Sequence, residues 1–342
     1  MRPLNHGASG RKFFVLGGGS MGKRRIRCLQ AHGVQPARIR VFDCRADRRL
    51  ECQSRYGVEG FESFEEGMEW DPQVVVISLP SRLHMTYCLK AAQAGRDFWC
   101  EIALSDSLEN TEALSSLVDE KRLVAALGIN TPFHPLVRQT KAWIQDPEFG
   151  PPIAYRLQFG NYLPNWHPWE PYQDFYDETQ IMGVIAQELG ILYAVLETRL
   201  SEVYAQLHRL GKLEIEGPDY VEIVGRTESG VAVSAQIDLM QDDQQHDYRV
   251  ISNAGVVELS LLPETQVRRY LNSNGHYEMR RAPRGYQFEQ CYVDEFTAFL
   301  QALEDRTAWY HPLSDGIHIL RCLEAIQESN RTGRKVTGFG AL

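Results

Sequence analysis

The chain has 342 residues, of which 43% are hydrophobic and 24% are charged, and its formal net charge is −9. This length suggests two domains, and the hydrophobic share is enough to build sizeable cores. The negative charge argues against a nucleic acid partner, because neutralising phosphates requires a basic face. The seven cysteines are scattered without a Cys-x-x-Cys pair, which indicates reduced thiols in a cytoplasmic protein. We expect no metal site, and no apolar run approaches the roughly 20 residues that a membrane span needs.

The first element in chain order is an apolar strand, predicted over 13–16, that runs into a glycine-rich turn. Residues 17–22 read Gly-Gly-Gly-Ser-Met-Gly, and a helix is predicted over 23–31. In such a turn Gly17 permits the tight bend, Gly19 lets the backbone approach a pyrophosphate, and Gly22 lets helix and strand pack closely. The start of the helix, with Ser20 and Met21, offers free N–H groups to phosphates. The pattern predicts a dinucleotide site.

The second predicted strand, 39–42, ends in Asp43, which follows Gly22 by 21 residues. A carboxylate at this position accepts hydrogen bonds from the adenosine ribose and repels a 2′-phosphate, which favours NAD(H) over NADP(H). Arg45 lies close enough in sequence to pair with such a phosphate, so NADP(H) stays possible.

Strands and helices continue to alternate up to residue 128. Such alternation predicts a parallel sheet covered on both faces, so we assign residues 1–128 to an α/β Rossmann domain. The further predicted strands are 74–79, 98–103 and 123–128, and the helices between them are 85–94 and 108–121.

After residue 152 the pattern changes to successive strands. They predict a mainly antiparallel open sheet. Together with two closing helices, the strands form an α+β domain over 129–342. The final helices are able to pack back on the first domain. The predicted strands are 153–162, 202–210, 220–227, 231–240, 249–252 and 256–261.

Over nearly its whole length the chain resembles the Gfo/Idh/MocA oxidoreductases. Besides the glycine turn and Asp43, Ser78-Leu79-Pro80-x-x-x-His84 is similar to the family's Thr/Ser-x-Pro-x-x-x-His turn beside the nicotinamide. Residues 128–135 are similar to its Gly-Tyr-Asn-x-Arg-Phe-x-Pro junction. The resemblance implies an NAD(P)-binding Rossmann domain and an open sheet that carries both a sugar site and the interface of a homodimer or homotetramer.

The resemblance also implies which residues line a site between cofactor and sheet. On the cofactor side these are Ser78, Leu79, Pro80, His84 and Glu101. An aromatic segment over 162–172 is similar to that of members in surface-sugar pathways, and it suggests a sugar, nucleotide sugar or sugar acid as substrate. The expected substrate side consists of Asn130, His134, Trp166, Trp169 and Gln187.

Two catalytic elements of the family are missing from this sequence. The family's lysine in Glu-Lys-Pro is replaced by Ile102, which has no proton to donate. The family's Asp-x-x-x-His pair, expected near Gln187, is also absent, because no histidine lies between His167 and His208.

Two hypotheses account for these losses. In the first, the protein is an NAD-dependent oxidoreductase whose acid–base role has moved to other residues, of which we select His167 and Tyr172. The other candidates are His84, His134, Tyr162, Tyr176 and Glu188; we expect His84 to shape the cofactor turn, and Glu188 to begin a helix and serve its dipole or solvent. In the second, the protein is an inactive NAD-binding sensor or the non-catalytic partner of an active enzyme. The intact cofactor turn is compatible with both, and we favour the enzyme.

Overall fold

The computed structural model describes residues 10–166, 168, 171–174, 176, 180–307 and 309–339. The chain forms two compact units. The first consists of Met1–Asn130 and Phe288–Ile317, and the second of Thr131–Gln287 and His318–Leu342. The sequence-based division at residue 128 lies two residues from this boundary, but the first unit also takes in a segment from near the carboxyl end.

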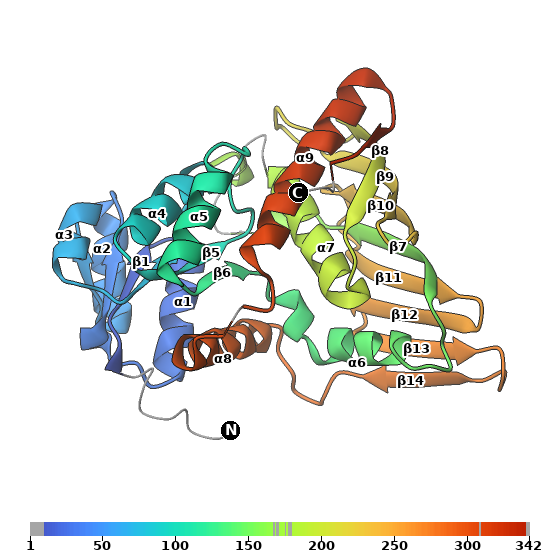
Figure 1. Cartoon of the computed structure of the whole chain (residues 1–342), viewed down its shortest axis with the longest axis horizontal. Helices are drawn as coiled ribbons and strands as arrows, with labels where there is room; N and C mark the ends of the chain where they lie inside the picture. The colour runs from blue at the N-terminus through green and yellow to red at the C-terminus, as the bar shows by residue number, and fades with distance from the viewer. Residues whose placement is uncertain are drawn as a thin grey trace. The chain divides into compact units, whose positions relative to one another are not determined.

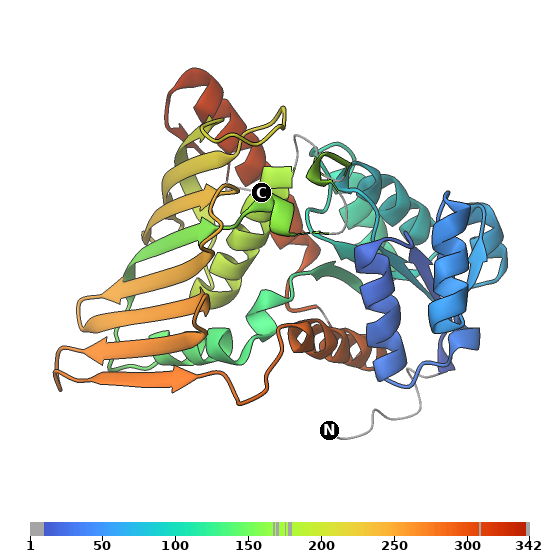
Figure 2. The same cartoon turned by 180° about the vertical axis from the view of Figure 1, so that it is seen from behind.

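The first unit is built on a six-stranded parallel sheet with the order β3-β2-β1-β4-β5-β6. Helices α4 and α5 cover one face, and α1 and α2 cover the other (Figures 1 and 2). The strands are β1 (Phe13–Leu16), β2 (Ile39–Phe42), β3 (Glu59–Phe61), β4 (Val74–Ile77), β5 (Asp97–Glu101) and β6 (Ala125–Gly128). The helices are α1 (Ser20–Ala31), α2 (Ala46–Tyr56), α3 (Phe64–Glu69), α4 (Ser81–Gln93), α5 (Thr111–Lys121) and α8 (Glu289–Asp305).

An aromatic cluster fixes α8 to this unit. The Trp99 ring on β5 lies 4.8 Å from the Phe296 ring and 5.2 Å from the Phe299 ring, both on α8. Trp309, after α8, packs edge-on against Trp99 at 5.6 Å. All of these side chains are buried. Burial of such large rings explains why a segment distant in sequence completes the Rossmann unit.

The second unit is built on a nine-stranded sheet with the order β14-β13-β12-β11-β7-β10-β9-β8-β15. All neighbouring strands are antiparallel except β7 and β10. The strands are β7 (Pro152–Gly160), β8 (Leu200–His208), β9 (Tyr220–Thr227), β10 (Ala232–Asp238), β11 (Gln245–Ser252), β12 (Gly255–Leu262), β13 (Gln266–Leu271), β14 (Tyr277–Arg281) and β15 (Val336–Thr337). Helices α6 (Pro135–Ile144), α7 (Gln180–Leu196) and the last part of α9 (Leu313–Thr332) pack on one face.

The two predicted sheets are confirmed in type, and several predicted bounds are close to those observed. Strands 39–42 and 220–227 have the predicted ends. The expectation that Glu188 begins a helix is wrong, because α7 begins at Gln180 and buries Glu188 in its middle. Within the described part of the chain, every helix is too short or too polar to cross a membrane.

Candidate functional site

The glycine turn of the first unit is shaped by contacts that leave no room for a side chain at Gly17 or Gly22. Gly17 has φ +97°, and a Cβ there would lie 2.4 Å from the Ser78 carbonyl oxygen. A Cβ on Gly22 would lie 1.7 Å from the Gly17 carbonyl oxygen. Helix α1 begins directly after this turn, and no side chain caps its first N–H groups. An uncapped helix start over a backbone-only turn fits the pyrophosphate of a dinucleotide.

Asp43 lies beside the same turn, at the carboxyl end of β2, and its side chain is held in one orientation. Its Oδ2 accepts a hydrogen bond from the Gly18 N–H at 2.8 Å, and its Oδ1 accepts one from the Arg45 N–H at 2.9 Å. The residue is only 5% exposed. Each carboxylate oxygen keeps a second acceptor position for a ribose hydroxyl.

The basic residue at this position is Arg48, which sequence reasoning did not select. Its Nη1 lies 3.6 Å from Asp43 Oδ2 and 3.6 Å from where a Cβ on Gly19 would stand. The Arg45 guanidinium instead pairs with Asp47. Arg48 follows Asp43 by five residues, so the first turn of α2 brings it over the glycine turn. It is therefore the guanidinium best placed to meet cofactor phosphate.

On the predicted nicotinamide side, His84 ties two loops together. Its Nδ1 lies 2.7 Å from the Ala103 carbonyl oxygen, and its Nε2 lies 2.6 Å from the Leu79 carbonyl oxygen. Burial lowers the pKa of His84, which favours the neutral ring. Both nitrogens face backbone carbonyl oxygens, and the neutral ring donates its single N–H to one of them, so His84 positions Leu79 and Pro80 and directs no nitrogen at a substrate.

Glu101 ends β5 in a buried ion network that the sequence did not reveal. Arg25 on α1 donates to both Glu101 oxygens, at 2.6 and 2.7 Å, and to Glu295 Oε2 at 2.9 Å. Ser78 and Trp99 also donate to Glu101 Oε1, at 3.4 and 3.2 Å. Burial raises the pKa of Glu295 to about 8, opposed by Arg25 and assisted by Glu101. One guanidinium therefore serves two carboxylates.

The residues predicted for the substrate side are placed as follows. Asn130 ends the first unit, and its buried Nδ2 has no hydrogen-bond partner among the described residues. In the second unit, Gln187 donates to Thr131 Oγ1 at 3.2 Å. His134 caps α6 by accepting the Leu136 N–H at 3.1 Å, and burial lowers its pKa to about 4. His134 is thus neutral and structural at neutral pH.

The aromatic segment is only partly described. Trp166 has a buried Nε1 with no hydrogen-bond partner among the described residues. The Tyr172 hydroxyl accepts the Glu214 N–H at 2.9 Å, and the Tyr176 hydroxyl donates to the Pro218 carbonyl at 3.0 Å. These bonds attach the segment to the loop before β9. His167 and Trp169 lie outside the described residues.

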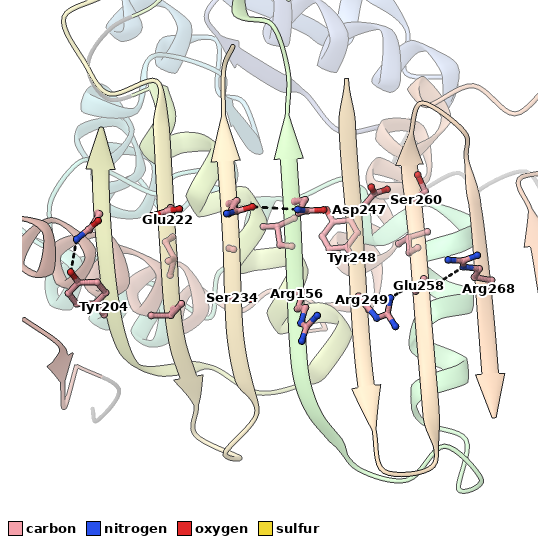
Figure 3. Close-up of a pocket in the computed structure, with 18 of the residues that line it drawn as sticks. Arg156, Tyr204, Glu222, Ser234, Asp247, Tyr248, Arg249, Glu258, Ser260 and Arg268 are labelled. Atoms are coloured by element: carbon pink, nitrogen blue, oxygen red, sulfur yellow. Dashed lines mark hydrogen bonds and ion pairs between the residues drawn. The ribbon is translucent and has the colours of Figure 1, made fainter. Parts of the chain in front are cut away.

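A broad hollow of about 940 Å³ lies on the face of the nine-stranded sheet that the helices leave open (Figure 3). In the register of the sheet, Arg156 stands beside Arg249, Arg249 beside Glu258, and Glu258 beside Arg268. Glu258 pairs with both Arg249 and Arg268, whereas Arg156 forms no ion pair with any described residue. The hollow is therefore a polar surface on which arginines and acidic residues are mixed, and Arg156 is left without an ion pair to any described residue.

No group of three or more histidine, cysteine, aspartate or glutamate side chains in the described ranges is arranged to hold a metal ion.

Residues 11–129 match the family model GFO_IDH_MocA, described as "Oxidoreductase family, NAD-binding Rossmann fold". The amino-terminal domain belongs to the Gfo/Idh/MocA oxidoreductase family. The match confirms the resemblance found in the sequence, and its description as an NAD-binding Rossmann fold agrees with the prediction that favours NAD(H).

Two curated relatives are similar over part of the chain. Levoglucosan dehydrogenase of Pseudarthrobacter phenanthrenivorans is 27% identical over 44% of this chain and 40% of its own length. The scyllo-inositol 2-dehydrogenase (NAD(+)) of Bacillus subtilis is 28% identical over 42% of each protein. The chain thus aligns with less than half the length of these relatives.

The fold is shared over the whole chain. A solved structure of levoglucosan dehydrogenase in complex with NADH and levoglucosan superposes with a TM-score of 0.84 at 18% identity, and the match covers 96% of this chain and 99% of that one. At this identity the likeness shows that both units have the family's fold.

The position of Arg48 predicts its effect on cofactor binding. Arg48→Ala should weaken NADH binding about tenfold, because a hydrogen bond to a charged group contributes about 1.5 kcal/mol or more. Fluorescence titration with NADH measures this, with Arg55→Ala, an exposed change on the same helix, as the control. Unchanged binding in Arg48→Ala together with weakened binding in Arg45→Ala would contradict the assignment.

The raised pKa of Glu295 predicts a pH-dependent effect on stability. Since the folded protein holds a proton that the unfolded chain releases above the ordinary glutamate pKa of 4.5, wild-type stability should fall as the pH rises from about 4.5 to 8. Glu295→Gln mimics the protonated form, so its stability relative to wild type should increase between pH 5 and pH 8. Urea unfolding at both pH values tests this, and an equal difference at both would show that Glu295 is ionised in the fold.

Proposed function

We propose that the protein is an NAD-dependent oxidoreductase that oxidises a hydroxyl group of a sugar or related polyol. The observation that carries the proposal is the uncapped start of α1 at a turn that admits no side chain at Gly17 or Gly22, with Asp43 fixed beside it. A protein without a dinucleotide ligand has no physical need for these features together.

The chain's residues have distinct roles in this function. Free N–H groups at the start of α1 and the Arg48 guanidinium hold the pyrophosphate, and Asp43 accepts hydrogen bonds from the ribose. His84 fixes the loop of Leu79 and Pro80 against the end of β5. The bound NAD supplies the hydride acceptor. Glu101 is held by Arg25, so it helps to fix the carboxyl end of β5 and is not a free base.

We assign recognition of the sugar to the second unit. Buried polar groups without a partner, such as Trp166 Nε1, suit a ligand rich in hydroxyl groups. The names of the two curated relatives, which act on levoglucosan and scyllo-inositol, support a cyclic polyol as the substrate class. His167, Tyr172, Trp169 and Gln187 remain the residues that the sequence proposes for this side.

A turnover assay tests the function directly. We expect the protein incubated with NAD and a panel of levoglucosan, inositols, free sugars, sugar acids and nucleotide sugars to produce NADH with at least one compound, detected by absorbance. NADH binding without turnover of any compound would reject the enzyme.

The absence of turnover would instead favour the second candidate function, an NAD-binding sensor or non-catalytic partner subunit. One specific observation supports it: Ile102, at the end of β5, replaces the lysine expected there and offers no proton. In that case a sugar should change NADH affinity or the association of the protein with another subunit, without forming product.

We also propose that the open face of the nine-stranded sheet is the contact of a homodimer or homotetramer. Exposed Val224 and the unpaired Arg156 share this face with the acidic side chains Glu222 and Asp247. A second copy brings such carboxylates opposite the arginines, which gives the face a partner of complementary charge.

The free cysteines and the NAD cofactor support a cytoplasmic location.

This assembly predicts that Arg156→Glu shifts the protein toward the monomer. The substitution removes the unpaired positive charge at the centre of the face and places another carboxylate there. Sedimentation velocity of wild type and Arg156→Glu measures the change, with Arg331→Glu on the exposed surface of α9 as the control. A wild type that is monomeric at all concentrations would contradict the proposed contact.

A further inference from the structure

A buried cluster of titratable groups lies between α7 and β11 in the second unit, and nothing described so far uses it. Glu188 Oε1 lies 3.1 Å from His246 Nε2, and Glu188 Oε2 accepts the Tyr248 hydroxyl at 2.9 Å. The Tyr248 hydroxyl also lies 2.5 Å from His246 Nε2. The three residues are 4%, 7% and 4% exposed in the order Glu188, His246 and Tyr248. Three groups able to exchange protons are therefore in mutual contact away from bulk water.

Counting protons gives the arrangement that satisfies all three contacts. A neutral His246 with its proton on Nε2 shares that proton between Glu188 Oε1 and the Tyr248 oxygen, which both accept, while Tyr248 donates its own proton to the other carboxylate oxygen. If the proton were on Nδ1 instead, the lone pair of Nε2 would face an ionised carboxylate oxygen at 3.1 Å. The ionised carboxylate thus selects the tautomer in which Nδ1 carries a free lone pair.

The surroundings of the ring leave Nδ1 available. Among the described residues, no group forms a hydrogen bond with His246 Nδ1, whereas Nε2 has two partners. Phe159 on β7 packs edge-on against the imidazole at 5.0 Å and fixes its plane. A carboxylate that binds one imidazole nitrogen and leaves the other free is the arrangement that makes histidine an oriented base.

In the described part of the chain, a second buried polar group lies near this cluster and lacks a partner. Tyr155 on β7 is 2% exposed, and its hydroxyl has no hydrogen-bond partner among the described residues. Its ring lies 6.1 Å from that of Tyr248, and both the burial and the nearby Glu188 charge raise the pKa of Tyr155, so it remains protonated. Leaving a buried hydroxyl unpaired costs about 1–3 kcal/mol, which a hydroxyl group of a bound sugar would offset.

We propose that His246 is the acid–base residue of the oxidation, with Glu188 and Tyr248 as its positioning residues and Tyr155 as a contact for a sugar hydroxyl. This inference rests on the proposed function. The substrate O–H bond breaks and its proton forms an N–H bond at His246 Nδ1. NAD, when bound at the glycine turn, would supply the acceptor for the hydride that leaves the carbinol carbon as the carbon–oxygen bond becomes a carbonyl. Glu188 stabilises the imidazolium, and the reverse reaction returns the proton.

The first test measures the tautomer of His246 without any substrate or cofactor. In protein labelled with nitrogen-15 at histidine, the ring nitrogens of His246, assigned through His246→Gln, should show a protonated Nε2 and an unprotonated Nδ1. Glu188→Gln should change this tautomer balance, whereas Tyr193→Phe should not. Tyr193→Phe is a matched control, because it removes another buried hydroxyl on α7, bonded to His318 at 2.8 Å. A proton on Nδ1 in the wild type would overturn the proposal.

The second test separates chemistry from binding. His246→Gln should lower kcat at least about 100-fold with NADH affinity unchanged, since general acid–base catalysis contributes about 100- to 10,000-fold. Added imidazole should restore part of the turnover of His246→Ala, and Tyr155→Phe should raise KM more than it lowers kcat. Wild-type kcat in both His246 variants would reject this inference alone. A wild type that binds NADH and oxidises no sugar would reject it together with the proposed function.

Discussion

The close packing of Gly22 on the Gly17 carbonyl is the constraint on which the rest of the first unit's site depends. Helix α1 can begin where it does because Gly22 has no side chain to meet the Gly17 carbonyl oxygen. This contact points the uncapped N–H groups of α1 at the space above Gly19, where the Arg48 guanidinium is the nearest side chain of the described residues. Asp43 is oriented by a backbone N–H of the same turn. Cofactor recognition therefore follows from backbone packing, and single side chains refine it.

A buried ion network in the same unit links α1 and the end of β5 to α8, which is distant in sequence. Arg25 is stacked near Trp99 and Phe296 and is bound by Glu101 and Glu295. Burial alone would lower the pKa of Arg25, but the two carboxylates raise it, so the guanidinium stays charged. If α8 moved away from β5, Arg25 would lose Glu295 or Glu101 and leave a buried charge without its partner, which is strongly unfavourable. The network therefore holds α8 and the end of β5 together.

Much of the fold was predictable because it follows local patterns. The β-branched run of β4 and the glycine turn are signals within a few residues, and the predicted strands there are confirmed. Helix α7 was begun too late, at Glu188 in place of Gln180, because extensive burial removes the polar face that marks a surface helix. The Arg25 network was also unpredictable, since its members are separated by as many as 270 residues.

The candidate site also has residues that the sequence reveals and residues that only the fold reveals. The sequence identified Asp43 and the turn, but it selected Arg45 where the structure brings Arg48 to the carboxylate. Nothing in the sequence near His246 and Tyr248 marks them as functional. Their spacing of two residues on a strand directs both side chains to α7, and only the fold supplies Glu188.

Calorimetric titration of the purified chain with NADH tests the central claim most directly. We predict one binding site per chain and loss of the binding heat in Gly22→Val, which fills the space between α1 and its turn. No binding heat in the wild type under conditions where the protein is folded, or full binding in Gly22→Val, would contradict the account.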